Sequence, residues 1–138
     1  MRCFGENEYG QLGGNAGDST FQPTPVEVGG LHDVLAIESG AYHTCAVLEN
    51  GDVSCWGQNT FAQLGNGDDT LQNTAVPGRV LGISHPQSLA VGRDFGCVLL
   101  GDRSVRCWGK NDQGRLGIGL EIPSTSLQPL DVVGLPYE

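Results

Sequence analysis

The chain has 138 residues, of which 22 are glycine, 7 are proline and only 17% are charged. Its 7 basic and 16 acidic residues give a net charge of −9, which disfavours binding to the phosphate backbone of a nucleic acid. No apolar run reaches the length of a membrane span, and no window of a dozen residues keeps the spacing of an amphipathic helix. The composition therefore predicts an all-β protein whose partners are neither nucleic acids nor membranes.

A unit of 52 residues recurs along the chain, and its first copy starts within the unit. Cys-Trp-Gly stands at 55–57 and at 107–109, and the variant Cys-Phe-Gly stands at 3–5. An asparagine and then a Leu-Gly pair follow each copy, and we expect the leucine to pack its loop onto the strands. Such a period is typical of a protein whose units stack on one another. We divide the chain into units at 1–54, 55–106 and 107–138, the last of which is partial.

Each unit is predicted to form four antiparallel strands. In the first full set the strands are expected at 34–37, 44–48, 52–57 and 77–80. The turn at 49–51 contains Asn-Gly, which favours a hairpin, and a glycine-rich loop at 57–70 follows the third strand. Pro77 suits an outer edge strand, where its missing N–H does no harm. Four strands at a period near 50 residues are typical of a propeller blade, so we predict a partial β-propeller of about two and two-thirds blades.

The hairpin turn sets which cysteines face each other. With a three-residue turn, residues whose numbers sum to 100 are opposed, so Cys45 faces Cys55. The same register in the second hairpin places Cys97 opposite Cys107. Opposed cysteines can meet disulfide geometry, so we predict two disulfides and an oxidising location, which is extracellular, periplasmic or at the cell surface. Buried reduced thiols in a cytoplasmic protein are the alternative.

The two ends of the chain interrupt the repeat. The residue that would face Cys3 precedes Met1, and the last unit stops before the strand that would begin another blade. We therefore expect a piece of a longer array, with self-association through open blade edges or through Cys3.

We expect neither a catalytic residue nor a cofactor or metal. Zinc at His43 and the nearby cysteines is the alternative to a disulfide, but Phe95 replaces His43 in the next unit. We therefore interpret His43 as a structural histidine whose hydrogen bonds are satisfied. Trp56 and Trp108 occupy a repeated position, and we interpret them as packing residues rather than binding residues.

Positions that differ between units are free of the structural role of the repeat, and we predict that they contact a protein partner. The candidates are Tyr42, Phe61, Arg93, Asp94 and Phe95. All of them lie next to predicted turns, so we expect them near one face of the molecule.

Residues 40–59, which contain both cysteines of the first hairpin and Cys-Trp-Gly, resemble the regulator of chromosome condensation repeat family. Gln63-Leu64-Gly65 extends the resemblance, which covers essentially the whole chain in two full units and a partial one. It implies a β-propeller, commonly of seven blades. The paired cysteines resemble those of bacterial extracellular members.

The roles of the family indicate protein binding more than catalysis. They include nucleotide exchange on a small GTPase, ultraviolet sensing in plants and inhibition of β-lactamase. We therefore expect a non-enzymatic protein-interaction scaffold. The alternatives are a guanine nucleotide exchange or regulatory factor for a small GTPase, and a propeller-type enzyme inhibitor.

Overall fold

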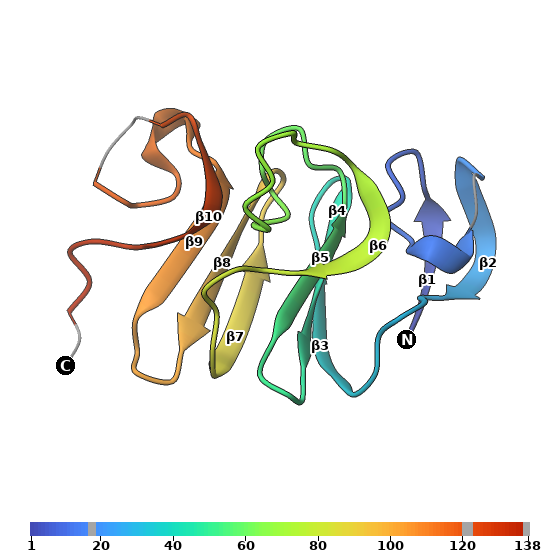
Figure 1. The fold of residues 1–138 in the computed structure, drawn as a ribbon, viewed down its shortest axis with the longest axis horizontal. Coiled ribbons are helices and arrows are strands. Elements are labelled where there is room, and N and C mark those ends of the chain that lie inside the picture. The colour runs from blue at the N-terminus through green and yellow to red at the C-terminus, as the bar shows by residue number, and fades with distance from the viewer. Residues whose placement is uncertain (17–18, 120–122, 137–138) are drawn as a thin grey trace.

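The computed structural model describes residues 1–16, 19–119 and 123–136 and is almost entirely β (Figure 1). Three antiparallel sheets stand side by side along its longest axis, and we call them the first, middle and last sheet in chain order. The first has two strands and the other two have four each. This confirms the prediction of a partial propeller made of four-stranded antiparallel blades.

The strands follow one another in the same order in the two four-stranded sheets. The first sheet contains β1 (Arg2–Glu6) and β2 (Phe21–Glu27). The middle sheet contains β3 (Val34–Ser39), β4 (His43–Leu48), β5 (Val53–Gly57) and β6 (Thr74–Arg79). The last sheet contains β7 (Pro86–Val91), β8 (Phe95–Leu100), β9 (Val105–Lys110) and β10 (Thr125–Asp131). Two short 3₁₀ turns, η1 (Gly14–Ala16) and η2 (Asp112–Gly114), interrupt the loops. Within the described ranges no helix has the length and apolarity needed to cross a membrane.

The outer strand of the middle sheet differs from its predicted range. It begins at Thr74 and ends at Arg79, earlier than the expected 77–80. The difference follows from its pairing with β5, in which Cys55 faces Gly78 and Gly57 faces Thr74. β6 lies at the edge of its sheet, which is where a strand accommodates Pro77.

The tight turns give the predicted register in both hairpins. Cys45 faces Cys55, and Cys97 faces Cys107. Gly51 takes a φ of 86°, and Arg103 takes a φ of 71° at the equivalent place in the second turn. The second hairpin therefore keeps the turn of the first without a glycine at the position with positive φ.

Disulfides join both opposed cysteine pairs. The Cα–Cα distance is 4.1 Å in each, which is the spacing of a pair that makes no backbone hydrogen bonds to its partner. Cys45 and Cys55 belong to the core between the middle and last sheets. A disulfide over a short loop contributes about 2–3 kcal/mol to stability by restricting the unfolded chain. Cys3 is a free, half-buried thiol on β1, and burial raises its pKa.

A tryptophan attaches each four-stranded sheet to the unit before it. The Trp56 indole N–H donates to the Gln11 carbonyl, and the Trp108 indole N–H donates to the Gln63 carbonyl, each at 2.9 Å. Both tryptophans have no exposed surface. Their interpretation as packing residues is confirmed.

A repeated asparagine holds the loop that follows each of the strands β1, β5 and β9. Its side-chain oxygen accepts a hydrogen bond from the backbone N–H of the leucine five residues later. The N–O distance is 3.0 Å for Leu12 and Asn7, 3.1 Å for Leu64 and Asn59, and 3.3 Å for Leu116 and Asn111. All three leucines are buried, as predicted. The loops are thus fixed to the sheets, and the side chains that they carry are held in place.

Candidate partner-binding cleft

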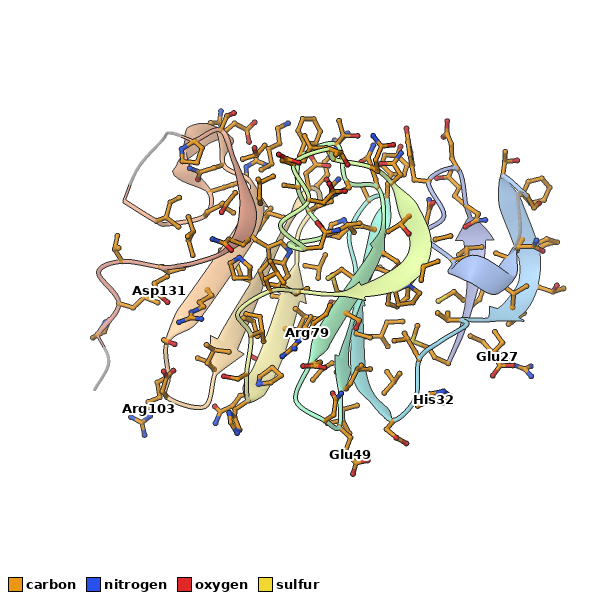
Figure 2. All side chains as sticks on the ribbon, viewed as in Figure 1. Glu27, His32, Glu49, Arg79, Arg103 and Asp131 are labelled. Atoms are coloured by element: carbon orange, nitrogen blue, oxygen red, sulfur yellow. A yellow bond between two sulfur atoms is a disulfide. The ribbon has the colours of Figure 1, made fainter. Side chains whose placement is uncertain are left out.

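A cleft of about 450 Å³ opens between the middle and last sheets. It is lined by Tyr42, Gln58, Phe61, Arg93, Asp94, Lys110 and Arg115. These residues precede the strands β4 and β8, end β9, or follow β5 and β9. They therefore lie opposite the hairpin turns that carry Glu49 and Arg103 (Figure 2). We call this space the inter-blade cleft.

Backbone hydrogen bonds hold together the turns that form the cleft. The N–H of Gln58 donates to the Tyr42 carbonyl at 2.8 Å, and the N–H of Lys110 donates to the Asp94 carbonyl at 2.9 Å. The N–H of Ala41 donates to the Arg93 carbonyl at 3.3 Å, which joins the turn of one sheet to the turn of the next. The walls of the cleft are therefore positioned by the backbone and not by side chains alone.

Two glycines allow the loops to approach these turns. Gly57 has a φ of 109°, and a Cβ there would lie 2.5 Å from the Tyr42 carbonyl oxygen. Gly109 has a φ of 100°, and its Cβ would lie 2.6 Å from the Asp94 carbonyl oxygen. Both the backbone conformation and the contact exclude a side chain.

Aromatic rings and cations contact one another in and around the cleft. The rings of Tyr9 and Tyr42 meet edge to face, with centroids 5.0 Å apart. The Lys110 ammonium lies 4.2 Å from the centroid of the Phe61 ring, within the range of a cation–π interaction. The Arg115 guanidinium lies 6.0 Å from the Phe95 ring, at the outer limit of that range.

The cleft is lined by three cations, Arg93, Lys110 and Arg115, which lie at different distances from carboxylates. Asp112 contacts Arg115 at 2.6 Å and Lys110 at 3.5 Å. Asp94 contacts Arg93 at 3.8 Å, and the Arg93 side chain is 76% exposed, whereas that of Asp94 is 8% exposed. Arg93 is therefore more loosely held than Lys110 and Arg115.

The structure brings four of the five predicted binding residues into this cleft, namely Tyr42, Phe61, Arg93 and Asp94. Phe95 does not line it. Its ring lies over Gly92 and faces Arg115, which is a residue that does line the cleft. The sequence prediction missed Gln58, Lys110 and Arg115, although these also differ from their counterparts in neighbouring units. The same comparison between units could have found them.

The prediction of a satisfied histidine is wrong. The His43 side chain is buried, with 1% of its surface exposed, and neither ring nitrogen has a hydrogen-bond partner among the described residues. The ring lies over Gly40, as the Phe95 ring lies over Gly92. His43 thus occupies the position that Phe95 occupies in the last sheet. Burial lowers its pKa from 6.5 to about 4.

Replacing His43 with phenylalanine is expected to raise the free energy of unfolding by about 1–2 kcal/mol at neutral pH, because two unsatisfied nitrogens are removed. The gain should grow as the pH falls from 6.5 to about 4, because the unfolded chain protonates His43 and the folded chain does not. The added difference is about 3 kcal/mol at the lower pH. Urea unfolding at several pH values measures it.

The matched control is His32→Gln, which changes an exposed histidine at the other end of the molecule (Figure 2). Because substitutions of exposed residues change stability little, it should not reproduce the gain expected for His43→Phe. Equal pH dependence of the His43→Phe variant and the unchanged chain would contradict the assignment of a buried neutral imidazole.

The chain matches the family model described as Regulator of chromosome condensation (RCC1) repeat at residues 3–47 and 50–99. A second model with the same description matches residues 34–63 and 87–115. Together these matches include both hairpins and all seven residues that line the cleft.

Relatives and solved structures agree with these matches. The Ultraviolet-B receptor UVR8 of Arabidopsis thaliana is 32% identical over 119 residues, which is 84% of this chain and 27% of the receptor. The human X-linked retinitis pigmentosa GTPase regulator is 31% identical over 119 residues, which is 86% of this chain and 12% of the regulator. Prp20p of Saccharomyces cerevisiae has a similar fold, with a TM-score of 0.79 at 15% identity, over 96% of this chain and 34% of that one.

The chain spans about a third or less of the length of each of these three proteins. The likeness to Prp20p bears on the fold alone, whereas the family models cover more than half of the chain and match its repeated motifs. The chain belongs to the regulator of chromosome condensation repeat family.

Proposed function

We propose that this chain is a non-enzymatic scaffold that binds a protein partner in the inter-blade cleft. The observation that carries the proposal is that four varying residues meet in one place, although Tyr42, Phe61 and the Arg93–Asp94 pair come from three separate turns and loops. The repeated tryptophans and leucines are buried instead. Variation at one solvent-accessible site, on a framework that is otherwise repeated, is what a binding function requires.

The chemical character of the cleft suits a protein surface. Tyr42 and Phe61 are half-buried, so each keeps part of its ring available for contact. Tyrosine and arginine are enriched among the residues that dominate the energy of protein interfaces. The rings are already held by Tyr9 and by Lys110, which lowers the entropy lost on binding.

The name of one relative also points to a protein partner. A second candidate function, regulation of a small GTPase, is favoured by the human relative that is named a GTPase regulator.

Alanine at Tyr42 or at Phe61 should weaken binding of a cleft partner about tenfold or more, since each removes an aromatic contact near the centre of the interface. Peptides selected from a random display library on the unchanged chain provide the partner, and fluorescence anisotropy gives the dissociation constant. The matched control is Phe21→Ala, which removes an exposed ring on β2, outside the cleft. Peptides whose affinity survives both cleft substitutions would refute the proposal.

We also propose that the chain works in an oxidising compartment, because a disulfide joins β4 to β5 and another joins β8 to β9. Thiol titration of the natively purified chain after unfolding without reductant should then give one reactive thiol, that of Cys3. Alkylation followed by mass spectrometry identifies which cysteine reacts. Five reactive thiols would contradict this location and favour the cytoplasm.

A further inference from the structure

We propose that the segment bound in the inter-blade cleft is a short acidic peptide, whose carboxylate pairs with Arg93 while its neighbouring side chains pack on Tyr42 and Phe61. This inference rests on the proposed scaffold function and specifies the chemistry of the partner.

The distribution of positive charge supports an acidic ligand. The chain has only seven basic residues, and three of them, Arg93, Lys110 and Arg115, line this one cleft. Among the described residues, Asp94 and Asp112 are the carboxylates that pair with them, so three cations meet two carboxylates in a chain whose net charge is −9. A local charge opposite to that of the whole chain favours a ligand that complements the cleft.

Comparison between units shows that the fold does not require these cations. The residues one period earlier are Ala41 for Arg93, Gln58 for Lys110 and Gln63 for Arg115. All three counterparts are neutral, yet both units form the same four-stranded sheet and the same loop. The three charges are thus an addition to the repeat, and they were added at one place.

Arg93 is the cation best placed to receive the carboxylate. Lys110 and Arg115 already contact Asp112, and each lies over an aromatic ring. The Arg93 side chain is largely exposed, and its contact with Asp94 is longer than a hydrogen bond. A guanidinium in this state can offer its planar pair of N–H donors to a carboxylate, which is a geometry that lysine lacks.

The surroundings of the cleft favour a short segment over a long polyanion. Charges are screened over about 8 Å at physiological salt, so a carboxylate at Arg93 experiences mainly the cleft. A nucleic acid would continue over the acidic surface beyond it and meet repulsion. The aromatic rings on the opposite wall suit the side chains of a peptide.

The test uses peptides selected from a random display library on the unchanged chain and then synthesised with each Glu or Asp replaced by Gln or Asn. The selected sequences should be enriched in acidic residues. The amide versions should bind about tenfold more weakly, because a hydrogen bond to a charged group is lost. Arg93→Ala should cause a similar loss, and binding should weaken at high salt.

Matched variants separate binding from folding. Arg93→Ala, Lys110→Gln and Arg115→Gln each introduce the residue found one unit earlier, so circular dichroism and urea unfolding should stay close to those of the unchanged chain. Arg79→Ala removes another exposed arginine, on β6 and away from the cleft, and should leave peptide affinity unchanged.

The possible failures are distinguishable. Peptides that depend on Tyr42 and Phe61 but tolerate both the amide replacements and Arg93→Ala would overturn the acidic ligand and leave the scaffold function standing. Peptides whose affinity is unchanged by every cleft substitution would overturn both the acidic ligand and the scaffold function. A single-stranded oligonucleotide that binds as tightly as the selected peptides, and requires Arg93, would overturn the peptide in favour of a general anion site.

Discussion

Replacing Trp108 with alanine is expected to lower the free energy of unfolding by about 3–5 kcal/mol, which is a large part of the stability of a chain of this size. Trp108 is fully buried, and its ring packs against Gly65 and Gly96. Its indole N–H also satisfies the Gln63 carbonyl, so the substitution leaves both a cavity and an unpaired acceptor between the middle and last sheets. Urea unfolding followed by far-ultraviolet circular dichroism measures the loss.

The repeat provides a matched control at the equivalent position. Phe4 stands two periods before Trp108 but is 69% exposed, because it lies on the two-stranded first sheet. Phe4→Ala should therefore change the free energy of unfolding by about 0.5 kcal/mol or less. Similar losses for Phe4→Ala and Trp108→Ala would show that packing between sheets does not dominate stability.

Replacing Gly109 with alanine should lower the free energy of unfolding by about 2–5 kcal/mol. The positive φ alone costs an alanine about 1–2 kcal/mol. The new methyl group would also press on the Asp94 carbonyl oxygen and on Phe95, and only a backbone shift can relieve that contact. Because this shift displaces the turn that carries Asp94, peptide affinity in the cleft should fall as well. Urea unfolding and peptide titration measure the two effects.

Gly5 is the control for this change, since it stands at the equivalent position with a φ of 110°, and a Cβ added there would meet no atom within 4 Å. Gly5→Ala should show the conformational cost alone, about 1–2 kcal/mol, and leave peptide affinity unchanged. If both variants lost equal stability, the close approach of loop and turn would have no energetic role.

The features that were predicted correctly are local ones. The three-residue turns and the alternation along a hairpin follow from neighbouring residues, so they placed Cys45 opposite Cys55 without any tertiary information. The buried tryptophans were also predictable, because a residue type that recurs in each unit serves the packing that the units share.

The features that were missed depend on how separate units meet. The sequence indicated that His43 and Phe95 are equivalent, but not that the surroundings of His43 offer its nitrogens no partner among the described residues. Lys110 and Arg115 come from the last sheet, and they join Tyr42 and Phe61 from the middle one only through the packing of the two sheets. The position of Phe95 over Gly92 is an exception, because it follows from a turn within one sheet.

The most direct test of partner binding in the inter-blade cleft is a nuclear magnetic resonance titration of the isotope-labelled chain with a selected peptide. The largest changes in backbone amide shifts are expected at Tyr42, Phe61 and Arg93, with none at Glu49 and Arg103, which lie on the hairpin turns at the opposite end (Figure 2). The largest changes at those two turns, with an unperturbed cleft, would contradict it.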